Sequence, residues 1–137
     1  MRPLLAILLL LAAPLVAAPV PKAVKKASSP DGRWRLVEFS NNGQGESVQS
    51  MARNWQIKGE TISCWLDGQS SAGGSKFGAP NPDKPNERVW GTMPAAFEVD
   101  GDTLRACYAH DGRKEMGECK PGKGVAYYVF ERVKEEK

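Results

Sequence analysis

Short stretches in which apolar and polar residues alternate, separated by glycine-containing turns, constrain this chain most strongly. The clearest is FEVDGDTLRACY, residues 97–108, which alternates on both sides of the turn Asp100-Gly101-Asp102. Alternation is the period of a strand with one buried face, and Asp-Gly is a preferred hairpin turn. The segment therefore predicts a β-hairpin.

Three further segments predict strands. GRWRLVEF, residues 32–39, places Trp34 and Leu36 on one face, and NWQIKGETISCWL, residues 54–66, reads as a second hairpin turning near Gly59. VAYYVFERV, residues 125–133, is apolar on both faces, as an interior strand would be. The order of these segments, without βαβ alternation, predicts an all-β, mainly antiparallel barrel or sandwich of six to eight strands.

Two connecting segments are less regular. ESVQSMAR, residues 46–53, places Val48 and Met51 at helical spacing, which predicts one or two turns of helix and no more. The polar segment 67–87 contains several prolines, which exclude most of it from a central strand. We expect an edge or a long loop there, with a short strand at Phe77.

The first thirty residues carry no globular pattern. Residues 1–17 combine Arg2, an apolar run and small residues, the layout of a secretory signal peptide cleaved after Ala17. The run is too short for a membrane span and is broken by Pro14, so no span is expected in the mature protein. Residues 18–30 predict an extended linker and residues 31–134 a single domain, secreted or periplasmic.

The charged residues argue against two functional classes. Nineteen Lys and Arg against sixteen Asp and Glu give a net charge of +3, too small for a nucleic-acid surface. The single histidine, His110, lies in the turn-like string AHDGR and leaves few options for a general base. No nucleophile elbow or phosphate-binding loop is present in the sequence. We therefore expect no catalytic residues, no cofactor and no enzymatic activity.

Cys64, Cys107 and Cys119 are an odd number of cysteines for an exported chain. Cys107–Cys119 is the preferred disulfide because both residues flank one loop, and a free buried thiol is the rival reading. The three thiols and His110 together resemble a zinc ligand set. The usual C-x2-C spacing is absent, however, and an oxidising compartment favours a disulfide, so we expect no metal.

The four tryptophans divide by strand phase. Trp34 and Trp55 alternate with polar residues and predict core packing. Trp65 is out of phase with Ile62 and predicts a position on the other face of the sheet, while Trp90, beside the proline-rich segment, predicts a barrel rim. Trp65 and Trp90 are therefore the candidate ligand-binding residues.

The order of motifs resembles a family of small secreted bacterial lipocalin-like domains. The matching motifs are a G-x-W first strand, a glycine hairpin near the middle, a hairpin of the form F/Y-x-V/L-x-G-D-x-L-x-x-C, and a K-P-G-x-G turn before a last strand ending in Arg. They fall here on Gly32, Trp34, Gly59, Phe97, Val99, Gly101, Asp102, Leu104, Cys107, Lys120, Pro121, Gly122, Gly124 and Arg132. The chain departs from the pattern at Cys64 and Cys119 and in the Gly- and Pro-rich stretch 71–87.

The resemblance implies a small lipocalin-like β-barrel and brings no catalytic residues with it. Barrels of this architecture often hold one small apolar ligand. The first functional hypothesis is therefore an exported, non-catalytic binding module for a small apolar ligand or a cell-envelope component. The alternative is a solid-core structural or protein-interaction module that contacts an exported partner through its loops and an exposed sheet edge.

Overall fold

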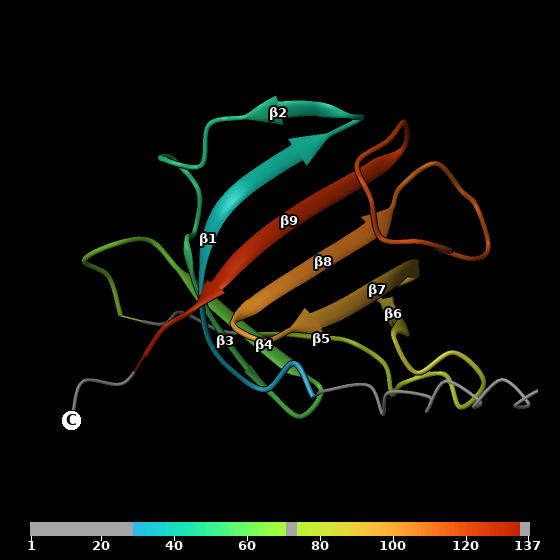
Figure 1. Cartoon of the computed structure of the whole chain (residues 1–137), viewed down its shortest axis with the longest axis horizontal. Helices are drawn as coiled ribbons and strands as arrows, with labels where there is room; N and C mark the ends of the chain where they lie inside the picture. Colours follow the sequence, from blue (N-terminus) through green and yellow to red (C-terminus); the bar gives the residue numbers. More distant parts are fainter. Residues whose placement is uncertain (1–28, 71–73, 135–137) are drawn as a thin grey trace, which may run out of the picture.

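The computed structural model describes residues 29–70 and 74–134. The predicted signal peptide and most of the predicted linker lie outside these residues. Within them the chain is all-β and antiparallel, as predicted (Figure 1). The strands are β1 (Gly32–Asn41), β2 (Gln44–Glu46), β3 (Asn54–Lys58), β4 (Thr61–Trp65), β5 (Gly74–Lys76), β6 (Glu87–Trp90), β7 (Met93–Asp100), β8 (Thr103–Ala109) and β9 (Val125–Arg132).

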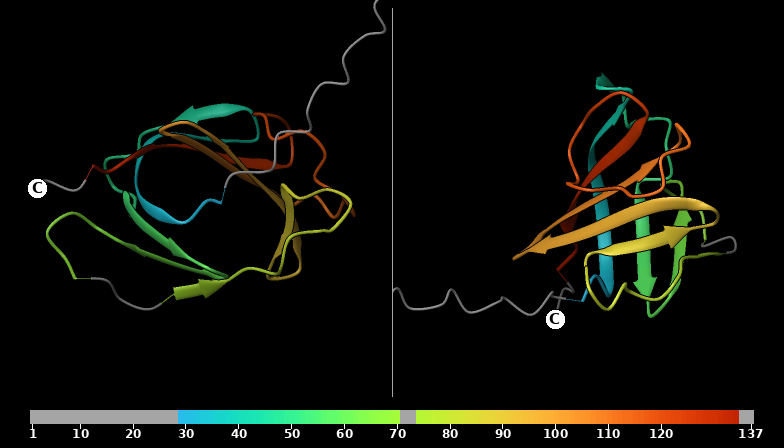
Figure 2. Two further views of the ribbon diagram at one scale, coloured as in Figure 1. Left: turned by 60° about the horizontal axis from the view of Figure 1, so that its bottom comes forward. Right: turned by 90° about the vertical axis from the view of Figure 1, so that its right-hand side faces the viewer.

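The strands form one sheet that curls into a nearly closed barrel. Their order is β5-β4-β3-β1-β9-β8-β7-β6, so neighbours in sequence are mostly neighbours in space and the first and last strands pair. The two ends of this sheet meet at a bridge between Phe77 and Trp90, beside which the Gly78 amide donates to the Val89 carbonyl at 2.7 Å. Figure 2 shows the sheet curving round on itself.

One edge of β1 has two successive partners. Its first residues, Gly32–Arg35, pair with β3, and its last residues, Phe39–Asn41, pair with β2. A β-bulge between Leu36 and Glu38 separates the two halves and returns Phe39 to the inner face. Because β3 pairs with the first half of β1 alone, β1, β9 and β8 extend beyond the end of β3. These three strands form a tall wall of the barrel, and β3 and β4 form a lower one (Figure 1).

The barrel interior is packed at the end where β1 begins. Trp34, Leu36, Leu104 and Phe130 are fully buried there, and the Trp34 indole nitrogen donates to the Pro30 carbonyl at 2.8 Å. Burying large apolar side chains of this kind contributes about 1.5–3 kcal/mol each. The interior cluster consists of Trp34, Leu36, Phe39, Trp55, Ile57, Ile62, Phe77, Ala95, Phe97, Leu104, Ala106, Ala126, Tyr128 and Phe130.

A second, smaller core lies on the outer face of β7, β8 and β9. The loop 110–124 covers this face and inserts Met116 and Cys119, which are both buried. Cys107 and Cys119 lie at disulfide distance, with Cα atoms 5.7 Å apart, as the preferred pairing predicts. The outer cluster consists of Ala96, Cys107, Ala109, Met116, Cys119, Val125 and Tyr127. Strands β8 and β9 are therefore buried on both faces, which explains the doubly apolar last strand.

The predicted helix in residues 46–53 is wrong. The described chain contains no helix, and hence none long and apolar enough to span a membrane. Instead, the Met51 amide donates to the Val48 carbonyl at 3.1 Å in a single turn, and both side chains pack against the interior cluster. A three-residue apolar spacing is met by one such turn as well as by a helix. Both predicted hairpins are confirmed, turning at Gly59 and Gly101, and Phe77 lies directly after β5.

Candidate functional site

At the end of the barrel away from Trp34, inward-facing side chains reach solvent. Cys64 pairs in register with Trp55, so both point inward, yet Trp55 is buried and Cys64 is exposed. Tyr108 shares the inward face of β8 with Leu104 and Ala106 and is partly exposed. We call this end the mouth and define it by Glu46, Cys64, Trp90, Tyr108, His110 and Tyr128.

Four aromatic rings contact one another in a closed circuit at the mouth. The Trp90 ring centroid lies 5.7 Å from that of Trp55 and 5.3 Å from that of Tyr108. The Tyr128 ring completes the circuit, 6.2 Å from Tyr108 and 5.4 Å from Trp55. Trp90 and Tyr108 are the partly exposed members, so they present aromatic surface to solvent.

Small residues beside the tyrosines explain why the rings fit inside the barrel. Tyr108 pairs with Ala95 on one side and Ala126 on the other. Ala106 pairs with both Phe97 and Tyr128. All three alanines are buried, so large rings alternate with methyl groups across the inner surface of β7, β8 and β9.

Polar groups surround these rings. The His110 ring nitrogen Nε2 lies 3.0 Å from the Asn41 side-chain oxygen, across Ala126. Glu46 pairs in register with Phe39 and therefore shares the inner face of the tall wall. The mouth thus combines aromatic surface with an amide, an imidazole and a carboxylate.

The Cys64 thiol and the Tyr128 phenol at the mouth have raised pKa values. Burial raises the pKa of Tyr128, and the neighbouring Tyr108, Cys64 and Glu46 raise it further. Partial burial of its sulfur also raises the pKa of the Cys64 thiol, although the side chain as a whole is exposed. Neutral groups of this kind suit hydrogen bonding to a ligand better than nucleophilic attack, which needs the thiolate.

Of the two predicted ligand-binding residues, only Trp90 lies at the mouth. Trp65 pairs with Asn54, out of phase with the inward pair of Trp55 and Cys64, and so lies on the outer face. The two tryptophans therefore do not line one site. The sequence phase of Trp65 had predicted this outer position.

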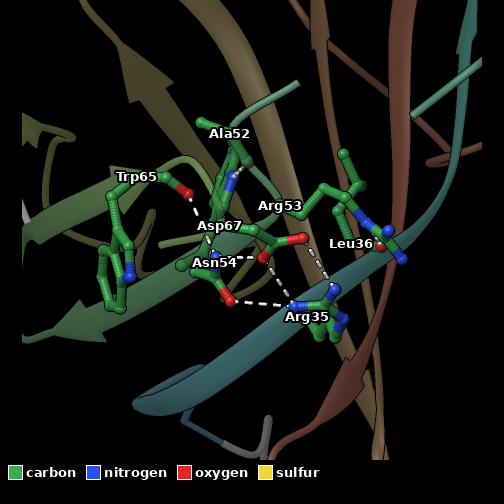
Figure 3. A network of polar contacts seen from close by, with 8 residues as sticks. Arg35, Leu36, Ala52, Arg53, Asn54, Trp65 and Asp67 are labelled. Carbon is green, nitrogen blue, oxygen red and sulfur yellow. Dashed lines mark hydrogen bonds and ion pairs between the residues drawn. The ribbon is translucent and has the colours of Figure 1, made fainter. Parts of the chain in front are cut away.

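The surroundings of Trp65 are a polar network on the outer surface (Figure 3). Arg35 donates to both carboxylate oxygens of Asp67 at 3.0 Å, and Asn54 donates to the same carboxylate at 2.8 Å. Asn54 also donates to the Trp65 carbonyl at 3.3 Å. Arg35 foremost, and then Asn54, lower the pKa of Asp67 to about 2. The network fastens the segment after β4 onto β1 and β3.

A surface groove lies apart from the mouth. It has a volume of about 430 Å³ and runs between the proline-rich loop at Pro80–Pro82 and the residues Lys114 and Glu115. Lys84 bridges the same two loops through an ion pair with Glu115 at 3.1 Å. This groove is the feature that the alternative interaction module would use.

The cysteines and the histidine are not arranged as a metal site. Cys107 and Cys119 lie beneath the loop on the outer face, whereas Cys64 faces the mouth. Among the described residues, no group of three or more histidine, cysteine or acidic side chains is placed to hold a metal ion.

Sequence reasoning missed Glu46, Cys64, Tyr108 and Tyr128 as site residues. Strand phase does indicate that two of these residues point inward, because Cys64 shares its phase with Ile62 and Tyr108 shares its phase with Leu104. Local sequence does not predict the pairing of β1 with both β2 and β9, which brings Glu46 to the same wall as Tyr128.

The motifs behind the lipocalin-like resemblance fall at turns and strand ends of the barrel. Gly32 and Trp34 begin β1, Gly101 and Asp102 form the turn between β7 and β8, and Arg132 ends β9. No protein-family model, curated protein or solved structure matches the chain significantly.

Proposed function

We propose that this protein is an exported, non-catalytic, lipocalin-like binding module whose barrel mouth holds a small apolar ligand. The observation that carries the proposal is the pair of partly exposed rings, Trp90 and Tyr108, at the open end of a barrel that is otherwise packed. Aromatic surface with a few convergent polar groups is typical of small-molecule sites. The cysteine pair at disulfide distance fits an oxidising compartment, secreted or periplasmic.

The packing of the barrel limits where the ligand lies. Trp34, Leu36 and Phe130 fill the far end and are fully buried. A ligand therefore rests against the rings at the mouth and does not pass through the barrel axis. This favours a small ligand, or one part of a larger cell-envelope component.

The side chains at the mouth support binding over catalysis. Cys64 and Tyr128 are protonated at neutral pH, and burial raises their pKa values further above it. His110 contacts the amide of Asn41, whereas a catalytic histidine is usually oriented by a carboxylate.

The test is a titration of the mature protein with Nile red, a neutral apolar dye, followed by dye fluorescence. We expect saturable binding by the wild type and roughly tenfold weaker binding by Trp90→Ala, which removes part of the aromatic surface. Trp65→Ala is the matched control, since it removes the same side chain from the outer face. Equal losses from the two substitutions would overturn the proposed site.

Absence of dye binding by the wild type would favour the alternative, a solid-core structural or protein-interaction module. In that case the groove beside Pro80–Pro82 is the surface to test, by crosslinking to exported proteins. The loops and the ends of the sheet at β5 and β6 would then carry the function.

A further inference from the structure

We infer that the mouth selects an organic cation, such as a methylated or primary ammonium group on an apolar body. This inference rests on the proposed binding function and names the class of ligand. It follows from the rings that face the mouth and from the charges that surround them.

The exposed rings offer the geometry that a cation needs. Trp90 and Tyr108 meet nearly at right angles, with an interplanar angle of 73° and centroids 5.3 Å apart. A cation within about 6 Å of such a ring centroid is attracted by the negative face of the ring, and tryptophan gives the strongest attraction. The corner between two rings lets one ammonium group contact both.

Two arginines of the chain lie over other rings. The guanidinium of Arg132 lies 4.2 Å from the Trp34 ring centroid, at the packed end of the barrel. The guanidinium of Arg88 lies 4.9 Å from the Phe77 ring centroid and 5.9 Å from that of Phe97. Across residues 29–70 and 74–134, no cation–π contact involves Trp55, Trp90, Tyr108 or Tyr128. The rings of the mouth are therefore left for an external cation.

The charges facing the mouth point to the same class of ligand. The inward residues near this end are Phe39 and Asn41 of β1, Gln44 and Glu46 of β2, Cys64 of β4, Trp90 of β6, Met93 of β7, Tyr108 of β8 with the following His110, and Ala126 and Tyr128 of β9. The acidic side chain in this set is Glu46, and the basic side chain of the same inner face is Arg88 of β6, in register with Ala95 and Tyr108.

Basic side chains of β1 and β8 point away from the mouth, and the guanidinium of Arg88 in β6 is held over Phe77 and Phe97. Arg33 and Arg35 alternate with the buried Trp34 and Leu36 and so lie outside the barrel. Arg105 of β8 is out of phase with the inward Leu104 and Ala106. An anionic ligand would thus meet a carboxylate and the negative faces of rings, without a compensating basic group from β1 or β8.

Glu46 lies close enough to act on the mouth. It pairs with Phe39, whose ring centroid is 4.7 Å from that of Tyr128. Its charge is also among the causes that raise the pKa of the Tyr128 hydroxyl. A cation seated on the rings would therefore also be attracted by this carboxylate.

The test compares choline with its neutral carbon isostere, 3,3-dimethylbutan-1-ol, by NMR titration of the mature protein. The two probes have the same shape, so their difference in affinity reports charge alone. We expect the wild type to bind choline at least about tenfold more tightly. Glu46→Gln should reduce this preference to within about threefold, and an unchanged preference in this variant would overturn the role of the carboxylate. Glu60→Gln, which removes an exposed carboxylate from the β3–β4 turn, is the matched control.

Equal binding of choline and the isostere, with Nile red still bound, would overturn the cation inference and leave the binding module standing. Preference for the isostere or for the anionic 3,3-dimethylbutyrate would overturn it in the same way. If the wild type binds neither Nile red nor choline, both the proposed function and this inference fail.

Discussion

Arg132 lies over the indole of Trp34, with its guanidinium carbon 4.2 Å from the ring centroid. This contact joins the start of the first strand to the end of the last, where the Arg132 amide also donates to the Asp102 carbonyl at 2.8 Å. Gly32 makes room for it, because a Cβ there would lie 2.8 Å from an Arg132 guanidinium nitrogen. The G-x-W motif and the final arginine thus meet where the start of β1 pairs with the end of β9.

Replacing Gly32 with alanine should destabilise the protein. Its φ of +138° is a conformation that L-residues rarely adopt, and the new methyl group would push Arg132 from Trp34. We expect the free energy of unfolding to fall by about 1–3 kcal/mol, measured by guanidinium denaturation. Gly45→Ala is the control, since a Cβ there meets no atom within 4 Å. Similar losses from both substitutions would contradict this account.

Removing the disulfide should uncover the outer face of β8 without dismantling the barrel. The double substitution Cys107→Ser, Cys119→Ser opens a loop of sequence separation 12 and should cost about 3 kcal/mol of stability. Cys64→Ser should change stability by less than about 0.5 kcal/mol because this thiol is exposed and unpaired. Denaturation curves followed by tryptophan fluorescence measure both. A loss from Cys64→Ser as large as that from the double substitution would refute the assignment.

Asp67 should make stability depend on pH in the acid range. Its pKa is lowered from 3.8 to about 2, so the carboxylate stabilises the folded state above its ordinary pKa. This contribution is lost as the pH falls through 2. The melting temperature of Asp67→Asn should therefore lie below that of the wild type at pH 7, and the two should converge towards pH 2. Asp83→Asn, in an exposed loop, is the control, and a gap that persists at pH 2 would count against the ion pair.

Cys64 should react slowly with alkylating agents at neutral pH. Burial raises the pKa of its thiol, and the thiolate is the reactive form. The rate of iodoacetamide labelling should rise with pH through a midpoint above that of the same cysteine in the unfolded chain. A ligand at the mouth should slow labelling further, since Cys64 shares that face. Mass spectrometry gives the rates, and a midpoint below the unfolded value would exclude this environment.

Local sequence predicted much of the barrel. Hairpins at Gly59 and Gly101 follow from turn chemistry, and the burial of Trp34 and Leu36 follows from alternation. The bulge after Leu36 was not predicted, because it depends on β1 changing partners from β3 to β2. The helix predicted around Val48 and Met51 is absent, and one hydrogen-bonded turn between β2 and β3 takes its place.

The mouth was harder to predict, because its residues come from strands far apart in the chain. The position of Trp90 at the rim follows from the proline-rich segment before it. The approach of Glu46 to Tyr128 depends on the register of β1 against both β2 and β9, which alternation alone does not specify. Strand phase identifies which side chains point inward, whereas register decides which of them meet.

The bridge between Phe77 and Trp90 is the junction at which the two ends of the sheet meet. Across it, the described chain has this bridge and the bond from the Gly78 amide to the Val89 carbonyl, whereas β8 and β9 pair over seven positions. Trp90 belongs to both this junction and the mouth, so a ligand stacked on its ring would hold the two ends of the sheet together. Occupancy would then slow hydrogen exchange at the Gly78 amide, because its partner carbonyl belongs to Val89, the residue before Trp90.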